Sequence, residues 1–306
     1  MPAPERLPAP GVTDTGELEE LLAEGELTVV GRIREASNAV LLCTVTHDGA
    51  SVDCVYKPVK GERPLWDFPD GNLARREVAA YLVSEATGWG LVPPTVLRDG
   101  PYGEGMVQQW IESAGPEGGP EGGPEGDAER DAEGGPEGDA EGGTPAGALL
   151  ALVEGEEAGE GWKPVAFAEV GEGRTALLVH ADDPRLRRLS VLDAVINNGD
   201  RKGGHLLPAP DGRLYGIDHG VTFHAEDKLR TLLWGWAGEP LTDEAREVLD
   251  ALAAGLAEGA PLATRLAELI NAVELAAVRD RVAHLLRTGT HPQPSGQWPA
   301  IPWPPV

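Results

Sequence analysis

The sequence lacks any apolar run of membrane-spanning length, and its start, MPAPERLPAPGVTDTGELEE, lacks the basic and apolar parts of a signal peptide. We therefore expect neither a transmembrane helix nor a secretion signal. Cysteine is almost absent as well: Cys43 and Cys54 lie on neighbouring candidate strands, and two thiols are too few for a disulfide framework. We expect both to be buried core residues of a cytoplasmic protein, because cysteine is among the residue types most often buried.

Positive charge is scarce throughout the chain. It holds 25 lysine and arginine residues against 51 aspartate and glutamate residues, which gives a formal net charge of −26. Such a surface repels polyanions, so we expect no nucleic-acid partner and no integral membrane association. Lysine is rare enough that each position is informative; the lysines are Lys57, Lys60, Lys163, Lys202 and Lys228. The composition gives no indication of an oligomeric state.

The chain divides into folded and disordered parts. Its 306 residues, of which 41% are hydrophobic, are enough for two lobes. Residues 1–16 are rich in proline and polar side chains, and we expect them to be disordered. The repeat in Gly115–Gly143 holds ten acidic residues, one arginine and no apolar side chain larger than alanine, so it cannot bury a core. We expect a first lobe at 17–112, a disordered insertion at 113–146 that is a linker or a regulatory acidic segment, and a second lobe at 147–306.

Patterning in the first lobe predicts antiparallel strands and one main helix. Short segments that are rich in β-branched residues and bounded by turns predict strands at Leu27–Arg34, Val40–Thr46, Ser51–Tyr56, Leu91–Leu97 and Gly105–Ile111. Asn72 is a suitable cap for a helix over Leu73–Thr87. Lys57 follows the third strand directly, and Glu77 lies in the first half of the helix.

Patterning in the second lobe predicts helices and a hairpin. Helices are expected at Gly147–Val153, Pro184–Ile196 and Asp243–Leu256, and the strands His205–Leu207 and Arg213–Ile217 are joined by a Pro/Asp/Gly turn. This hairpin brings Asp200 and Asp218, at its open ends, close together. Two carboxylates beside Arg201 and Lys202 indicate a site for a cation and an anion together, as a metal-bound phosphate requires.

The stretch Val191–Phe223 resembles the catalytic loop and metal-binding motif of the protein-kinase-like superfamily. Asp200 corresponds to the catalytic aspartate of that family, and Asp218-His219-Gly220 corresponds to its Asp-Phe-Gly motif. The steps of five residues from Asp200 to His205 and thirteen from His205 to Asp218 are similar to those of protein kinases. His205 is the departure, because it stands where the family has an asparagine as second metal ligand.

A finer resemblance is carried by Gly199-Asp200-Arg201, which is similar to the core of the phosphatidylinositol 3-/4-kinase branch. From about Gly31 to Pro305 the chain resembles an uncharacterised bacterial family labelled phosphatidylinositol kinase-like. The resemblance implies an α+β, two-lobed protein-kinase-like fold. Its N-lobe would hold a small antiparallel sheet with one main helix, and its C-lobe would be mostly helical.

The resemblance also assigns roles to residues. Asp200 and Lys202 are the catalytic candidates, for the acceptor hydroxyl and for charge on the γ-phosphoryl group. The nucleotide-binding candidates are Ser37, Asn38, Lys57, Glu77, Gln109 and Trp110. Glu85 is the rival of Glu77, an ordinary hairpin turn is the alternative for Ser37 and Asn38, and core packing is the alternative to adenine stacking for Trp110. Asp218 and His205 are the metal candidates, with ATP and Mg²⁺ as cofactors, or Mn²⁺ because imidazole suits transition metals.

These observations predict an ATP-dependent phosphotransferase that acts on a hydroxyl of a protein or small molecule. Two alternatives stay open: a nucleotide-binding pseudokinase, which His205 favours, and adenylyl transfer on the same fold. A phosphoinositide acceptor lies within the first hypothesis, and the acidic surface argues against it. The sequence does not identify the acceptor.

Overall fold

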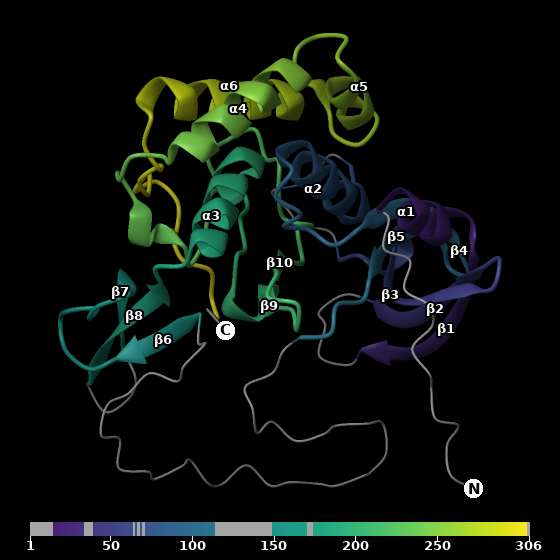
Figure 1. Ribbon diagram of the computed structural model, residues 1–306, viewed down its shortest axis with the longest axis horizontal. Helices are drawn as coiled ribbons and strands as arrows, with labels where there is room; N and C mark the ends of the chain where they lie inside the picture. The colour runs from purple at the N-terminus through teal and green to yellow at the C-terminus, as the bar shows by residue number, and fades with distance from the viewer. Residues whose placement is uncertain are drawn as a thin grey trace, which may run out of the picture.

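The computed structural model describes residues 15–33, 39–63, 65, 68, 71–113, 149–169 and 174–304. Nearly all of the predicted disordered stretches, and the phosphate-turn candidates Ser37 and Asn38, lie outside these described residues. The described chain forms an antiparallel sheet flanked by helices and a second, mostly helical lobe (Figure 1). The predicted α+β architecture, with an antiparallel sheet in the first lobe, is therefore confirmed.

The first lobe is built on a five-stranded antiparallel sheet with strand order β1-β2-β3-β5-β4. Its strands are β1 (Glu26–Ile33), β2 (Val40–His47), β3 (Ala50–Pro58), β4 (Thr95–Gly100) and β5 (Gly103–Gln109). Cys43 and Cys54 pair directly across β2 and β3, and both are fully buried as predicted. Helix α1 (Thr15–Glu24) packs its leucines against this part of the sheet.

Helix α2 (Leu73–Thr87) begins and ends where the sequence predicted. The side chain of Asn72 accepts a hydrogen bond of 2.8 Å from the N–H of Arg75, which satisfies a donor that the first turn leaves open. Gly88 ends the helix with a φ of 70°, a conformation that favours glycine. Residues 79–83 of α2 are all buried in the core cluster that also contains the helices of the second lobe, so α2 joins the two lobes (Figure 1).

The described part of the second lobe combines helices with two small sheets. The helices are α3 (Pro184–Ile196), α4 (Asp243–Gly255), α5 (Pro261–Ala267) and α6 (Ala272–Thr288), and short 3-10 turns lie at Gly203–His205 (η2) and Trp234–Trp236 (η3). A further 3-10 turn, Val59–Gly61 (η1), follows β3 in the first lobe. The strands are β6 (Leu150–Val153), β7 (Trp162–Glu169) and β8 (Thr175–Ala181), in the order β6-β8-β7, and the hairpin β9 (Leu206–Pro208) with β10 (Leu214–Gly216).

One predicted element of the second lobe was wrong. The apolar run that ends at Val153 was expected to be helical, but Leu150–Val153 forms β6 and pairs antiparallel with β8. A short apolar run does not distinguish a helix from a strand by its own pattern, and here the neighbouring strand decides. The predicted helix over Pro184–Ile196 and the hairpin are both present.

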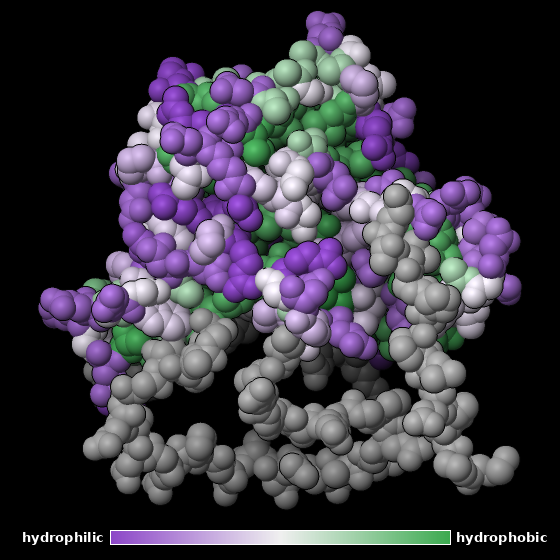
Figure 2. All heavy atoms as spheres, in the orientation of Figure 1, coloured by the Kyte–Doolittle hydropathy of each residue, from purple (hydrophilic) through white to green (hydrophobic). Residues whose placement is uncertain are grey.

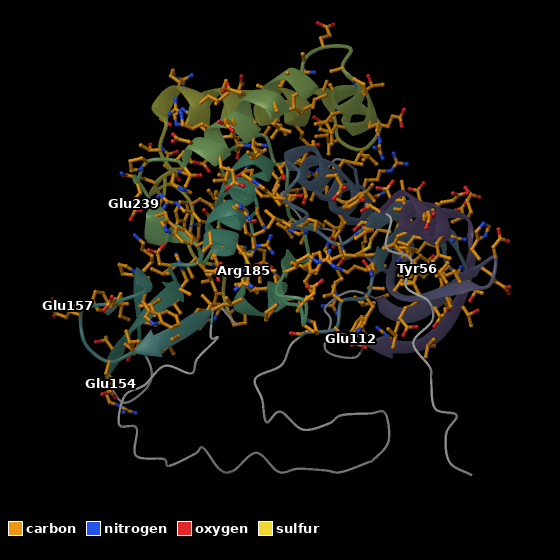
Figure 3. All side chains as sticks on the ribbon, in the orientation of Figure 1. Tyr56, Glu112, Glu154, Glu157, Arg185 and Glu239 are labelled. Atoms are coloured by element: carbon orange, nitrogen blue, oxygen red, sulfur yellow. The ribbon has the colours of Figure 1, made fainter. Side chains whose placement is uncertain are left out.

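The outer surface is largely polar. Figure 2 shows hydrophilic side chains over much of the visible outer faces of both lobes, with apolar side chains mainly in the recesses between elements. Glu154 and Glu157 lie at the outer end of the small β6-β8-β7 sheet (Figure 3). None of the helices that the structure describes is both long enough and apolar enough to cross a membrane.

A substitution at Leu189 of α3 tests the packing of the core that joins the two lobes. Because its side chain is fully buried, Leu189→Ala should lower the free energy of unfolding by about 2–5 kcal/mol. Leu152→Ala in β6 is the matched control, since Leu152 is 56% exposed and its truncation should cost less than about 0.5 kcal/mol. Urea unfolding followed by circular dichroism gives both values. Equal losses would contradict the packing of α3.

An aromatic cluster ties the small sheet to η3. The ring centroid of His180 lies 4.3 Å from that of Trp236. The Nδ1–H group of His180 donates to the carbonyl of Ala181 at 2.9 Å, and the Nε2 atom of His180 accepts from the N–H of Gly235 at 3.0 Å. A Cβ at Gly235 would lie 2.4 Å from His180 Nε2, so only glycine permits this approach. The neutral imidazole satisfies both contacts, and burial lowers the pKa of His180 to about 4.

Protonation of His180 should make stability depend on pH. Between its ordinary pKa of 6.5 and its folded pKa of about 4, the unfolded chain binds a proton that the folded chain does not. The contribution of neutral His180 to the free energy of unfolding is therefore complete above pH 6.5. It is lost as the pH falls towards 4, and the free energy of unfolding then changes by up to about 1.4 kcal/mol per pH unit. Urea midpoints at pH 7, 6 and 5 measure it. His180→Gln should flatten the profile, His284→Gln at an exposed position should not, and equal profiles for both variants would refute the assignment.

Candidate active site

A cavity of about 320 Å³ is lined by residues of both lobes. Six of the sequence-predicted site residues line it together: Lys57, Glu77, Asp200, Lys202, His205 and Asp218. Pro58, Leu73 and Gly220 are among its other walls. A larger cavity of about 470 Å³ lies beside α6 and contains none of these six residues, so the chemistry-bearing side chains select the smaller one.

Strand β3 aims Lys57 into the cavity. Side chains alternate along a strand, and Tyr56, labelled in Figure 3, is fully buried in the core beneath the sheet, so Lys57 projects to the opposite face. Its Nζ donates to Glu77 Oε1 at 2.8 Å and to Asp218 Oδ1 at 2.5 Å. One ammonium group thereby connects the sheet, helix α2 and the segment after β10. Glu85, the rival of Glu77, does not line the cavity.

The neighbouring charges of Lys57, Glu77 and Asp218 determine the protonation states of Lys57 and Asp218. Burial alone would lower the pKa of Lys57, but the carboxylates of Glu77 and Asp218 outweigh it and raise that pKa. The positive charge of Lys57 in turn holds the pKa of Asp218 well below its usual range. Lys57 is thus an ammonium and Asp218 a carboxylate at neutral pH, which are the forms that bind phosphate and a divalent cation.

The backbone around Asp218 is held in an uncommon conformation. Asp218 has a φ of 63°, in the left-handed region that non-glycine residues rarely occupy. Glu77 stabilises this turn, because its Oε2 accepts the N–H of His219 at 2.8 Å while its Oε1 accepts Lys57. Strain of this kind is commonly found at functional sites. The same carboxylate therefore positions both the lysine and the Asp-His-Gly segment.

A buried ion pair holds the loop after α3. Arg201 and Asp193 have fully buried side chains that meet at 2.9 Å, and Arg201 also donates to the carbonyl of Ile217 at 3.1 Å and to Nε2 of His219 at 2.6 Å. Asn198 completes the arrangement by donating to Asp193 Oδ1 at 2.9 Å. The sequence analysis missed the role of Asp193. Its signal was a single acidic residue inside the apolar end of α3, followed eight positions later by an arginine.

Asp200 lies on the same loop after α3 and lines the cavity. The side-chain oxygen of Asn198 accepts the N–H of Asp200 at 2.9 Å and orients it. One oxygen of Asp200, Oδ2, is 3.1 Å from Lys202 Nζ, and the other, Oδ1, is 3.7 Å from the guanidinium of Arg230. Arg230 was not among the sequence candidates because it approaches from the segment near Thr231 rather than from the motif.

His205 faces Asp218 from the hairpin. Its Nδ1 accepts the N–H of Lys202 at 3.4 Å, which places the ring proton on Nε2, and Nε2 lies 3.4 Å from Asp218 Oδ2. Burial lowers the pKa of His205, so the imidazole is neutral at neutral pH. In this arrangement the ring of His205 lies against the carboxylate of Asp218.

Gln109 and Trp110, the other predicted site residues that the structure describes, are not brought to the cavity. Gln109 and Trp110 do not line it, and their N–H groups already donate to the carbonyls of Pro94 and Asp53, each at 2.9 Å. Trp110 is 41% exposed. Figure 3 shows Glu112 at the lower edge of the first lobe, where the chain leaves the sheet. Ser37 and Asn38 lie outside the described residues.

The carboxylate of Asp218 suits a divalent metal ion that is bound together with a phosphate group. Within the described ranges no group of three or more histidine, cysteine, aspartate or glutamate side chains is arranged to hold a metal ion. Asp218 is nevertheless ionised and half exposed at the cavity, and Mg²⁺ is commonly bound by one or two carboxylates together with substrate phosphates and water. The donor set therefore suits a metal–nucleotide complex better than a free ion.

A relative of similar length shows the family. The chain is 49% identical over 284 residues to Protein Rv2133c of Mycobacterium tuberculosis. The aligned region covers 93% of this chain and 94% of that protein. The chain belongs to the Rv2133c family. No protein-family model matches it.

Solved structures show the fold at much lower identity. The Golgi casein kinase aligns with a TM-score of 0.51 at 14% identity, over 90% of this chain and 74% of that one, and its complex with Mn/ADP aligns with a TM-score of 0.50. Fam20 of hydra, solved with sugar, aligns with a TM-score of 0.52 at 12% identity, over 91% of this chain and 89% of that one. At such identities the likeness establishes a protein-kinase-like fold and nothing finer.

The buried ion pair can be tested by removing its cation. Arg201→Met should lower the free energy of unfolding by about 3–5 kcal/mol, because it leaves the carboxylate of Asp193 buried without its partner. Arg213→Met is the control: its side chain is 66% exposed and pairs with Asp211 at the surface, so its loss should cost less than about 1 kcal/mol. Guanidinium unfolding measures both. A loss for Arg201→Met no larger than the control would refute the structural role.

Proposed function

We propose that this protein is an ATP-dependent phosphotransferase that moves the γ-phosphoryl group of ATP to a hydroxyl acceptor. The observation that carries the proposal is the placement of Lys57 between Glu77 and Asp218, in a cavity that also holds Asp200 and Lys202. A phosphate-binding ammonium, a cation-binding carboxylate and a carboxylate for the acceptor are the groups that phosphoryl transfer needs close together. Kinase-like structural neighbours, one of them with Mn/ADP bound, support this choice of chemistry.

The residues divide the work by position. Lys57 binds the α- and β-phosphates, and Glu77 holds Lys57 in place through its Oε1 contact of 2.8 Å. Asp218, next to His205, would hold Mg²⁺ or Mn²⁺ together with phosphate oxygens, and that ion would neutralise phosphate charge when bound. Lys202, which lines the same cavity, neutralises charge on the group in transfer.

Asp200 receives the acceptor hydroxyl. The acceptor oxygen forms a bond to the γ-phosphorus while the bond to the β,γ-bridging oxygen breaks, and ADP leaves with the electron pair of that bond. The hydroxyl proton passes to Asp200 and then to solvent. Lys202 and Arg230 flank both oxygens of Asp200, so the carboxylate contributes mainly by positioning the hydroxyl.

A second candidate, a nucleotide-binding pseudokinase, is favoured by one observation. His205 occupies the position of the family's second metal ligand, and its Nε2 turns to Asp218 at 3.4 Å instead of offering a free lone pair. The adenine contacts of Gln109 and Trp110, the phosphatidylinositol 3-/4-kinase branch and the cytoplasmic location stay predictions.

Variants of the two aspartates distinguish these functions. Asp200→Asn should keep metal-dependent ATP binding while transfer falls by about 10²–10⁴-fold, the range for a positioned general base. Asp218→Asn should weaken metal-dependent ATP binding, with partial recovery at high metal concentration. Calorimetry with ATP and Mg²⁺, beside assays with γ- and α-labelled ATP, measures both effects.

Asp211→Asn, at an exposed turn carboxylate, is the control for these variants and should match the parent chain. Transfer of label from the α position would replace phosphoryl transfer with adenylyl transfer. Nucleotide binding with no transfer by the parent chain would establish the pseudokinase. Full activity of both Asp200→Asn and Asp218→Asn would refute the proposed site.

A further inference from the structure

One cationic side chain next to Asp200, that of Arg230, is not part of the lining of the nucleotide cavity. Lys202, next to Oδ2 of Asp200, lines that cavity, whereas Arg230, next to Oδ1, does not. Asp200 therefore lies between the nucleotide cavity, which Lys202 lines, and a second surface, which carries Arg230. If ATP occupies the cavity, the acceptor hydroxyl reaches Asp200 from this second surface.

Arg230 is fixed on this second surface by the backbone beside it. Its N–H donates to the carbonyl of Asn198 at 2.8 Å, its own carbonyl accepts the N–H of Arg201 at 3.0 Å, and its Nε donates to the carbonyl of Gly199 at 2.7 Å. The segment that carries Arg230 thus runs along the loop that carries Asp200. The guanidinium is 27% exposed, so it is both held in place and accessible.

The C-terminal segment supplies the other wall. Trp298 lies under Lys228, whose Nζ is 3.7 Å from the indole centroid, and Arg230 is 6.0 Å from the same ring. The carbonyl of Ala300 accepts the N–H of Thr231 at 3.0 Å and Nε1 of Trp234 at 2.8 Å, which anchors this segment. In Figure 1 the tail leaves α6 and ends in the region of the hairpin β9-β10.

We propose that Arg230, with Lys228 held on Trp298, recognises a phosphate monoester on a small hydroxyl acceptor. The inference rests on the proposed phosphotransferase function and names its substrate class. In a chain with a net charge of −26 and few lysines, Arg230 lies 3.7 Å from the carboxylate of Asp200, and Lys228 lies over the same indole ring that Arg230 approaches. The side chain of Lys228 is only 8% exposed and its Nζ lies 3.9 Å from the carboxylate of Glu226, so Lys228 adds positive charge from a buried position, whereas Arg230 is the cation that a ligand can reach.

The size of the cluster indicates a compact ligand. The planar guanidinium of arginine matches two phosphate oxygens at once, and charge-assisted bonds of this kind are the strong ones. Arg230 is accessible whereas Lys228 is buried over the same indole ring, so one guanidinium binds the dianionic group and the ammonium of Lys228 strengthens the positive potential around it. An extended acidic peptide would need cations distributed along the surface. Trp298 acts as a positioning residue, because it touches the cations and not Asp200.

The experiment fills the nucleotide cavity first. The full chain is saturated with a non-hydrolysable ATP analogue and Mg²⁺, and glycerol 3-phosphate, inorganic phosphate and glycerol are titrated by calorimetry. We expect the two phosphates to bind and glycerol not to bind. Arg230→Gln and Trp298→Ala should each weaken phosphate binding by about tenfold. Trp303→Ala is the control, since Trp303 is 84% exposed in the same tail and should bind as the parent does.

The transfer assay gives a second readout from γ-labelled ATP. The preference for glycerol 3-phosphate over glycerol, measured within each variant, should fall in Arg230→Gln and Trp298→Ala through a higher KM and stay unchanged in Trp303→Ala. Lysophosphatidic acid, which carries the same head group on a lipid, shows whether the source is soluble or membranous. A serine peptide flanked by glutamates tests the peptide alternative.

The outcomes separate this inference from the function on which it rests. Phosphate binding that is absent from the parent chain, or equal in the parent, Arg230→Gln and Trp298→Ala, overturns the inference while ATP binding and transfer can stand. Preferential labelling of the acidic peptide also overturns it. If the ATP analogue fails to bind, the proposed function fails, and the phosphate titration without nucleotide still reports on Arg230 and Trp298.

Discussion

The active site depends on the buried ion pair between Asp193 and Arg201. A charge buried without a partner is costly, so each of these residues requires the other, and the pair fixes the end of α3 against the loop that follows it. Arg201 extends this constraint by donating to Ile217 and His219, the residues on either side of Asp218. The position of Asp200 on the loop and that of Asp218 after the hairpin are thereby set by one guanidinium.

Lys57 transmits the same constraint to the first lobe. It bonds Glu77 of α2 and Asp218, while Glu77 also accepts the N–H of His219. Arg76, the neighbour of Glu77, is buried and donates to Glu274 of α6 at 2.6 Å and to the carbonyl of Thr222 at 2.7 Å. Successive residues of α2 thus hold the second lobe and Lys57, which is why charged side chains occupy buried positions on this helix.

Much of the fold could be predicted because its boundaries are marked by local chemistry. Asn72 and Gly88 delimit α2, and Asp183 accepts the N–H of Arg185 at the start of α3, so these helices follow from the sequence. Lys57, Glu77, Asp200 and Asp218 were found because their order and spacing resemble the motifs of the protein-kinase-like superfamily. Arg230 and Trp298 could not be found in this way, because they reach the site through pairing between segments far apart in sequence. Leu150–Val153 shows the same limit, since only its partner β8 makes it a strand.

The burial of α2 in the main core has a consequence for control of activity. In a kinase-like fold, a helix that bears the glutamate partner of the lysine could act as a switch by swinging outward. Here that motion would expose the apolar side chains at 79–83 and separate Arg76 from Glu274, so the displaced state would carry a large free-energy cost. A regulator of this protein would therefore gain more by acting on the strands of the first lobe, or on the C-terminal segment, than on the helix. The ion pair between Lys57 and Glu77 is therefore held in place by the fold itself, and access to the cavity is what a regulator could still change.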